Sequence, residues 1–440
     1  MNVVIVGAGI TGLAAAISLR RSGHKVTIYE RSSMNNEVGA AINVAPNVGR
    51  FLLPWGLDPV RARFVETPGM YFMSHETAEQ FPGGEYDHTR NSELYGAPLF
   101  YAHRVDLHEA LKQLAIDPDG PGLPATIHLR SDVRSYTPEA PSIALADRRV
   151  ITADLVIAAD GVHSIGVEHV FGRPNPPEVP TGIKSNLCYR FLIPKADVDA
   201  DPETRFFNES PQSLGCRVWA DIPGRKRLIS YPCRNYEVLN FIAIIRDDSV
   251  VSDRREDWLA SVDKSEVLER WSNFHPGLLK VINKATEVKR WPLLYRPPIP
   301  TWHKGRMVLA GDAAHPMLPH HAQGGAQGIE DGLALGLVLH GVTNTSQIEE
   351  RLVLYEKIRR NRASAIQVMS NFGFDEKAPD ELVEFLEGKP NPKTVKEMIQ
   401  IAYVPDVVKQ TILTMSEFDP SWKLPEGFFS EKAGNNRDCN

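Results

Sequence analysis

The amino-acid sequence predicts an α/β fold in which a Rossmann-like parallel sheet is combined with an antiparallel sheet and C-terminal helices. Three observations support this. Residues 1–30 read as strand, glycine turn, helix and second strand, residues 181–290 contain short alternating runs, and residues after 331 follow a helical period. The order of these segments predicts two domains followed by helices.

Length and composition are typical of a globular protein with two domains. The chain has 440 residues, 42% of them hydrophobic, and a formal net charge of -6 with acidic and basic residues interspersed. This charge distribution shows no basic segment of the kind that binds nucleic acid. We therefore expect small-molecule partners, and a monomer or homodimer.

Cysteine usage and the absence of long apolar runs indicate the compartment. Four cysteines lie far apart without a C-x-x-C pair, which argues against a zinc ribbon, a redox dithiol and a disulfide framework. The apolar start lacks the basic residues of a signal peptide, and no apolar run reaches the roughly 20 residues that cross a bilayer. We expect a soluble, cytoplasmic protein, and peripheral membrane contact stays open.

The opening segment MNVVIVGAGITGLAAAISLRRSGHKVTIYE is a βαβ unit. Gly7, Gly9 and Gly12 form G-x-G-x-x-G between strand and helix, and Glu30 closes the second strand. Gly7 allows the tight turn, Gly9 lets a pyrophosphate approach the backbone, and Gly12 lets helix and strand pack closely. Glu30 can accept hydrogen bonds from ribose hydroxyls. The pattern predicts dinucleotide binding rather than an ordinary glycine-rich turn.

Two further strands end on similar turns far along the chain. The strand in ADLVIAADG ends at Asp160, and the strand at 306–310 ends at Gly311 and Asp312. An NAD dehydrogenase would show a more compact run of βα units, so this long-range assembly favours FAD. The absence of a second G-x-G-x-x-G argues against a disulfide-reductase type of enzyme.

Three motifs in this order resemble the class A, FAD-dependent aromatic hydroxylases related to para-hydroxybenzoate hydroxylase, and within them the salicylate-hydroxylase-like and fungal secondary-metabolite-tailoring monooxygenases. The motifs are GAGITGLAAAISLRRSGHKVTIYE, the DG motif in AADGVHS, and the GD motif in GDAAHPMLP with its trailing GGAQGIED. The resemblance covers residues 2–370. It implies an FAD-binding domain at 1–70, 100–180 and 291–345, a substrate domain at 71–99 and 181–290, and C-terminal helices and tail at 346–440.

The resemblance also implies cofactor-binding residues. Gly7, Gly9, Gly12 and Glu30 would hold the ADP half of FAD, and Asp160 would serve both FAD and the pyridine nucleotide. The other implied FAD contacts are Ala41, Arg104, Asp312 and Gly325. Two positions depart from the family pattern: Val167 stands where relatives have an arginine after the DG motif, and Ala41 stands where they have a glycine.

Arg190 and Tyr231 match an arginine and a tyrosine that hold and deprotonate the phenol in related hydroxylases. From the residues alone, an edge-strand arginine and a half-buried tyrosine are equally ordinary. The resemblance implies that NADH or NADPH reduces FAD and that a flavin hydroperoxide then transfers one oxygen atom from O2 to an electron-rich aromatic ring. Arg190 would stabilise the phenolate and Tyr231 would hydrogen-bond it or shuttle its proton.

Other functions stay open at this point. The same chemistry serves an epoxidase or another oxygenase acting on an alkene or indole, and a non-catalytic flavin-binding protein is the alternative of another class. The apolar side chains of Tyr189, Trp219 and Phe241 favour an aromatic substrate if they line its pocket, although they could equally be core residues.

The stretch MVLAGDAAHPMLPHHAQGGAQGIEDGLAL contains three histidines, which first suggests a metal site. The spacing of His315, His320 and His321 fits neither H-E-x-x-H nor a Cys/His finger, so no metal is expected. We interpret the stretch as a strand, an aspartate at its tip, a proline-stiffened turn, and glycines opening a helix that stabilises negative charge on reduced flavin. His320 and His321 are predicted to lie where substrate and flavin meet.

Overall fold

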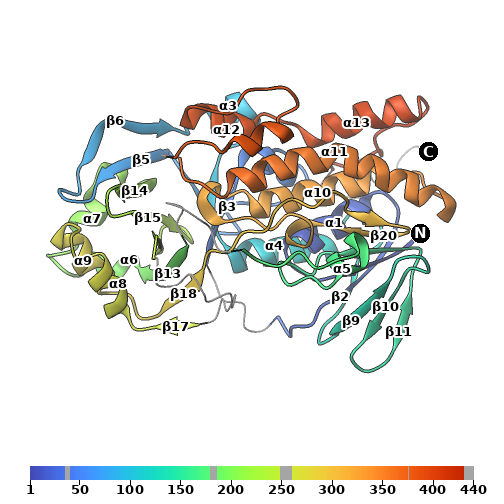
Figure 1. Ribbon diagram of the computed structural model, residues 1–440, viewed down its shortest axis with the longest axis horizontal. Coiled ribbons are helices and arrows are strands. Elements are labelled where there is room, and N and C mark those ends of the chain that lie inside the picture. Colours follow the sequence, from blue (N-terminus) through green and yellow to red (C-terminus); the bar gives the residue numbers. More distant parts are fainter. Residues whose placement is uncertain (35–39, 179–185, 248–259, 375, 431–440) are drawn as a thin grey trace, which may run out of the picture.

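The computed structural model describes residues 1–34, 40–178, 186–247, 260–374 and 376–430. Figure 1 shows the antiparallel sheet with its helices on one side of the molecule. The parallel sheet lies on the other side, with the long helices α1 (Ile10–Arg21), α10 (Gly324–Val338) and α11 (Ile348–Met369). The predicted fold class is confirmed: a parallel sheet, an antiparallel sheet and C-terminal helices are all present.

The parallel sheet has strand β1 (Asn2–Val6) at its centre. Strand β1 pairs in parallel with β2 (Lys25–Tyr29) and β12 (Leu155–Ala158), and β12 pairs in parallel with β20 (Met307–Leu309). Strands β8 (Thr126–His128) and β19 (His303–Lys304) complete its edges. Because the carboxyl ends of parallel strands meet at one edge, the turns at Gly7, Asp160 and Gly311 come together there.

Helix α1 (Ile10–Arg21) packs between α4 (Arg104–Ile116) and α10 (Gly324–Val338). The contact with α10 is close because glycines of α10 recur at every fourth position. A Cβ added to Gly332 would lie 2.5 Å from the backbone nitrogen of Ala15, and one added to Gly336 would lie 2.0 Å from Oγ of Ser18. Helix α10 starts at Gly324, as the glycine run predicts.

The second large sheet has eight strands. Adjacent strands in this sheet pair antiparallel, except for β14 and β5, which pair in parallel. The order is β17 (Ser261–Val262), β18 (Val288–Pro292), β13 (Leu187–Pro194), β16 (Val238–Ile245), β15 (Lys226–Cys233), β14 (Cys216–Asp221), β5 (Gly69–Ser74) and β6 (Gln80–Asp87).

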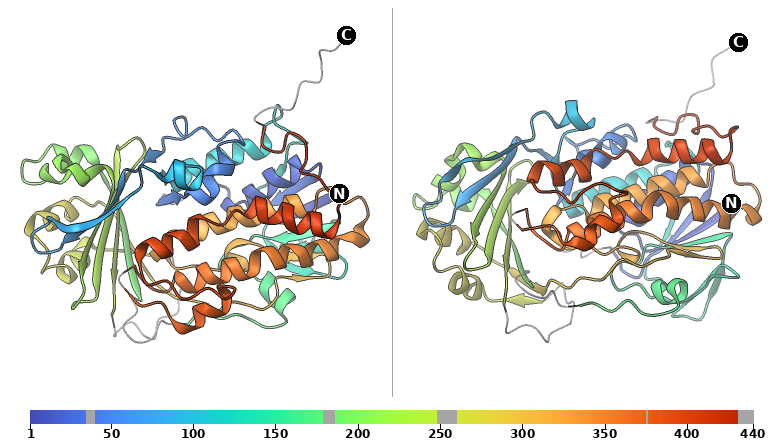
Figure 2. Two further views of the ribbon diagram at one scale, coloured as in Figure 1. Left: turned by 90° about the horizontal axis from the view of Figure 1, so that it is seen from above. Right: turned by 45° about the horizontal axis from the view of Figure 1, so that its top comes forward.

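The outer face of this sheet buries a core under four short helices, α6 (Lys195–Asp199), α7 (Phe206–Glu209), α8 (Lys264–Arg270) and α9 (Pro276–Ile282) (Figure 2). Tyr189, Trp219 and Phe241 lie in this core and are at most 1% exposed. The interpretation of these three aromatic residues as pocket lining is therefore wrong, because alternate strand residues face opposite sides and theirs is the helix-covered side.

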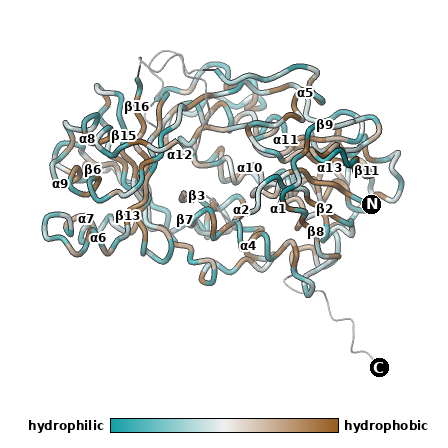
Figure 3. The backbone as a smooth tube through the Cα atoms, turned by 90° about the horizontal axis from the view of Figure 1, so that it is seen from below, coloured by the Kyte–Doolittle hydropathy of each residue, from teal (hydrophilic) through white to brown (hydrophobic). Residues whose placement is uncertain are grey.

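Smaller elements connect the two large sheets. Hydrophobic residues are concentrated in strands such as β13 and β16 (Figure 3). Within the described ranges, no helix is both long and apolar enough to cross a membrane. The remaining strands are β3 (Ala41–Val44), β4 (Val65–Glu66), β7 (Phe100–His103), β9 (Val133–Thr137), β10 (Ser142–Leu145) and β11 (Val150–Thr152). The remaining α-helices are α2 (Pro46–Leu52), α3 (Asn91–Tyr95), α5 (Gly166–Phe171), α11 (Ile348–Met369), α12 (Val395–Tyr403) and α13 (Val407–Phe418).

Candidate active site

The glycine turn after β1 has the shape of a diphosphate cradle. Gly7 has a φ of +100°, and a Cβ added there would lie 2.3 Å from the carbonyl oxygen of Ala159. A Cβ on Gly12 would lie 2.0 Å from the carbonyl oxygen of Gly7, whereas Gly9 has nothing within 4 Å. Two glycines are thus required by packing, and the third faces open space at the start of α1, where a phosphate group fits.

Glu30 is fixed beside this turn. Its Oε2 accepts a hydrogen bond from the Ala8 N–H at 2.8 Å, and its Oε1 accepts one from the Ser32 N–H at 2.8 Å. A carboxylate has about four acceptor positions, so both oxygens keep capacity for further hydroxyl donors. The position and free capacity of Glu30 fit the ribose of an adenosine.

Asp160 and Asp312 follow the other two strand ends. Oδ2 of Asp160 accepts a hydrogen bond from the Tyr136 hydroxyl at 2.8 Å, while its Oδ1 has no partner in the described part of the chain. Asp312 keeps access to solvent. The surrounding protein nevertheless desolvates the Asp312 carboxyl and so raises its pKa. The charges of His315, Arg104 and Arg296 act in the opposite direction and lower it.

Arg104 and Arg296 thus lie within electrostatic reach of Asp312. A cavity of about 270 Å³ next to Asp312 is lined by Arg296, His163 and Val167. Sequence reasoning singled out Arg104 but missed Arg296, which lies 8% exposed and donates from Nε to the carbonyl oxygen of Asn175 at 3.1 Å. Arg296 therefore places a cation in the same cavity as Val167.

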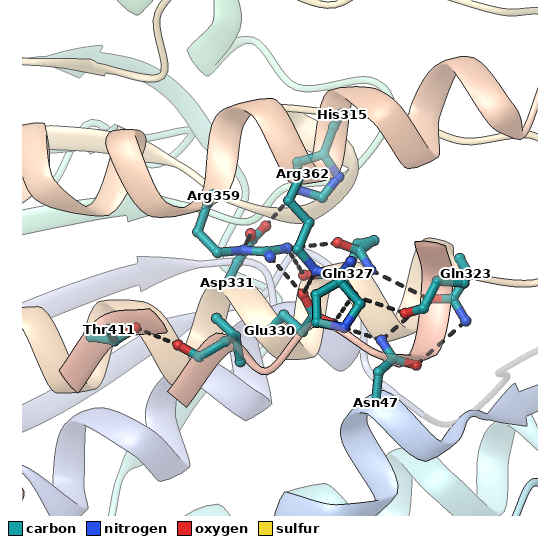
Figure 4. A network of polar contacts seen from close by, with 12 residues as sticks. Asn47, His315, Gln323, Gln327, Glu330, Asp331, Arg359, Arg362 and Thr411 are labelled. Atoms are coloured by element: carbon teal, nitrogen blue, oxygen red, sulfur yellow. Dashed lines mark hydrogen bonds and ion pairs between the residues drawn. The ribbon is translucent and has the colours of Figure 1, made fainter. Parts of the chain in front are cut away.

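The GD loop is held by a buried charge network (Figure 4). Oδ2 of Asp331 accepts hydrogen bonds from the Gly311 N–H at 2.8 Å and pairs with Nε2 of His315 at 2.6 Å. Nε of Arg359 donates to Oδ1 of Asp331 at 2.8 Å. His315 is therefore part of the loop's support.

Glu330 carries the other half of this network. Arg359 and Arg362 both pair with it, at 2.5 and 2.6 Å, and Nδ2 of Asn47 donates to its Oε1 at 2.6 Å. Arg362 also donates to the carbonyl oxygens of two residues near the end of α12. Among the residues that the structure describes, no cluster of His, Cys, Asp and Glu could hold a metal ion. The network joins α10 to α2, α11 and α12.

Ala41 and Gly325 lie near the same edge of the parallel sheet. Ala41 begins β3 and is buried, and a Cβ added to Gly325 would lie 2.8 Å from Cδ1 of Ile42. A side chain at position 325, in the first turn of α10, would therefore require the end of the Ile42 side chain to move. These backbone segments could approach a flat ring closely.

Arg190 and Tyr231 come together from strands β13 and β15. The Arg190 guanidinium donates to the carbonyl oxygen of Ala41 and lies within electrostatic reach of the Tyr231 hydroxyl. Tyr231 is 5% exposed, and its ring centroid lies 4.4 Å from that of Tyr101. Burial raises the pKa of the Tyr231 hydroxyl, against the lowering effect of Arg190.

Tyr231 lines a mostly apolar cavity of about 320 Å³ on the inner face of the antiparallel sheet. His320 and His321 line it too. Nε2 of His321 pairs with the carbonyl oxygen of Phe372 at 3.1 Å. The apolar walls include Met70, Phe72, Val218, Ile229, Ile242, Phe374 and Ile399.

The chain is similar to a protein family, to characterised proteins and to solved structures. A family model described as an FAD binding domain matches residues 1–370. The FAD-dependent monooxygenase cfoG of Aspergillus candidus is 46% identical, over 97% of this chain and 98% of the relative. Hispidin-3-hydroxylase of Neonothopanus nambi is 32% identical, over 84% of this chain and 87% of the relative. A salicylate hydroxylase substrate complex shares the fold, with a TM-score of 0.69, 21% identity and coverage of 94% of this chain and 98% of that one.

Proposed function

The chain belongs to the FAD binding domain family and is an FAD-dependent monooxygenase, and on this premise we propose that it hydroxylates an electron-rich phenolic substrate with NAD(P)H and O2. The resemblance to the class A aromatic hydroxylases is confirmed by its relatives. The observation that carries the proposal is the Arg190 guanidinium within electrostatic reach of Tyr231, whose side chain lines an apolar cavity.

The residues around the three strand ends fit FAD. Gly7, Gly9, Gly12 and Glu30 would hold its ADP half, and the remaining contacts would come from the residues named earlier: Ala41, Arg104, Asp160, Asp312 and Gly325. The chemistry supplied by bound FAD is two-electron uptake from a nicotinamide and delivery of an electrophilic oxygen atom from O2. The division into an FAD-binding domain, a substrate domain and C-terminal helices is part of this proposal.

Arg190 and Tyr231 would activate the substrate. A phenolate ring is a much stronger nucleophile than a phenol ring, so a cation that stabilises the phenolate favours attack on the electrophilic oxygen. Arg190 supplies this charge. Because its pKa is raised, Tyr231 keeps its own proton and acts as a hydrogen-bond partner that orients the substrate oxygen.

The apolar walls of the cavity would keep water away from the reacting atoms. Water exclusion strengthens the interaction between Arg190 and a phenolate, because the local dielectric constant is low. On the other side of the GD loop, Arg296 and His163 would meet the NAD(P)H co-substrate. Arg296 would supply the positive charge that Val167 lacks.

Arg190→Ala tests the proposal. The variant should keep its FAD but form product at least about a hundredfold more slowly, since a donor to a developing anion is lost. Arg205→Ala changes an exposed arginine of the same domain and should behave as wild type. The measurements are flavin absorbance, phenol-stimulated NAD(P)H oxidation, and mass spectrometry for an added oxygen atom.

Three results would decide against parts of this proposal. A wild-type protein that takes up no FAD would end it. Unchanged product formation by Arg190→Ala would remove Arg190 from the chemistry. Full FAD content in Asp312→Ala would remove Asp312 from the flavin site.

A further inference from the structure

The apolar cavity follows strand β15. Tyr231, Ile229 and Arg227 all line it, since alternate residues of a strand face the same side. Four residues of a strand span about 13 Å. Val218 and Ile242, which pair with Ile229 on the neighbouring strands, continue the floor at its middle. The cavity is therefore a slot with Tyr231 near one end and Arg227 near the other.

The end remote from Tyr231 is polar but carries no unbalanced charge. His320 lines this end near Arg227, and its ring makes no hydrogen bond within the described residues. Burial, assisted by the charge of Arg227, lowers the pKa of His320 to about 3. Nη2 of Arg227 pairs with Oε1 of Glu376 at 3.0 Å.

A neutral imidazole has one N–H donor and one acceptor nitrogen. In an otherwise apolar slot, an imidazole without a protein partner leaves hydrogen-bonding capacity for a bound molecule. A carboxylate would meet no excess positive charge here, because Glu376 balances Arg227. A neutral oxygen, such as a hydroxyl or carbonyl, matches this end of the slot.

We propose that His320 is a positioning residue that hydrogen-bonds a neutral hydroxyl or carbonyl oxygen on the part of the substrate remote from the phenol held at Tyr231. This inference rests on the proposed function and narrows its substrate class. The substrate is an elongated aromatic molecule with two rings, an oxygen substituent at each end and no carboxylate. The apolar side chains between Tyr231 and His320 contact the ring frame.

Two probes test this, para-phenylphenol and para,para′-biphenol, which share a two-ring frame and differ only in the remote hydroxyl. Calorimetry on the FAD-loaded protein should show that the biphenol binds about five- to tenfold more tightly, the effect of one hydrogen bond. His320→Leu should abolish this preference, and His320→Asn should keep part of it. Tyr231→Phe should weaken both probes and leave the preference in place. FAD content reports on folding in each variant.

The inference is overturned if wild-type protein binds both probes equally, or if the preference survives in His320→Leu. It is also overturned if neither probe binds to a protein that holds FAD and oxidises NAD(P)H with another phenol. Loss of the preference in Tyr231→Phe would place the discriminating contact at the wrong end of the slot. A wild-type protein without FAD would overturn the proposed function itself, so the two failures are distinguishable.

Discussion

Arg359 is fully buried between two carboxylates, and its removal would leave both without their shared cation. Burial disfavours the charges of Glu330 and Asp331. Arg362 and Arg359 nevertheless lower the pKa of the Glu330 carboxyl overall, and His315 and Arg359 lower that of Asp331. Arg359→Met should therefore destabilise the protein by about 3–5 kcal/mol, the cost of breaking a buried ion pair from one side.

Urea unfolding of Arg359→Met measures this loss, with Arg360→Met as the control. Arg360 is the next residue of α11, has a 37% exposed side chain, and lies 3.8 Å from Glu356. Its substitution should cost less than about 1 kcal/mol. Equal midpoints for the two variants would contradict a stabilising role for the network.

Some of the site residues can be predicted from the sequence alone, and others cannot. Gly7, Gly9, Gly12 and Glu30 sit in one βαβ unit, so their spacing alone predicts their proximity. Arg296 could not be found in this way, because it lies in an irregular segment and reaches Asp312 only through the fold. Arg359 lies on a different helix from its partners Glu330 and Asp331. The helical pattern of its own segment identifies Arg359 only as one polar residue among several and does not predict these partners.

Helix α10 depends on glycine for its packing against α1. Gly332 faces the backbone of α1, where an added Cβ would lie 2.5 Å from the nitrogen of Ala15. Backbone atoms cannot move aside as a flexible side chain can. Gly332→Ala should therefore destabilise the protein by about 1–3 kcal/mol despite the better helix propensity of alanine.

Gly324→Ala is the matched control on the same helix, because its Cβ would meet only Cβ of Met317 at 3.7 Å, an ordinary contact. Thermal unfolding of the two variants should separate them clearly. A Gly332→Ala protein as stable as wild type would show that the two helices can move apart at little cost.

At the scale of elements, periodicity and turn residues predict the βαβ unit, the strand before the GD loop and the helix that follows it. These local signals do not predict which elements line a cavity. Tyr189, Trp219 and Phe241 alternate correctly for strands, but nothing local says which face receives helices α6 to α9. Helix α12 carries no motif, yet its Ile399 and Tyr403 line the apolar cavity.

At the scale of the whole molecule, the apolar cavity is lined by residues on both sides of the point where the family model ends. The family model ends at residue 370, while Gly373, Phe374, Ile399 and Tyr403 of the following segment complete the cavity wall. Arg362 ties that segment to Glu330, on the same helix as Gly325, through the carbonyl oxygens of Ile401 and Ala402. If the cavity binds the substrate as proposed, residues outside the region that the family model matches contribute to substrate selection.

Buried histidines make the stability of the whole molecule dependent on pH. Burial lowers the pKa of four of them, to about 4 or about 3, from an unfolded value near 6.5. They are His24, His88, His103 and His321. The unfolded chain therefore binds more protons than the folded protein below pH 6.5.

Because the unfolded state takes up these protons first, the free energy of unfolding should fall as pH drops from 7 to 5, by up to about 2 kcal/mol for each buried histidine at pH 5. The window lies above the range where Glu330 and Asp331 titrate, so their contribution is still intact.

His24→Gln should reduce the loss of stability between pH 7 and pH 5 by the contribution of one histidine. The variant also loses the contact with the Leu339 carbonyl, but this changes its stability at pH 7 and not the difference between the two pH values. His128→Gln, at an exposed site, should leave the loss unchanged. Urea unfolding at pH 7, 6 and 5 measures all three proteins, and a stability that stays level over this window in the wild type would contradict the argument.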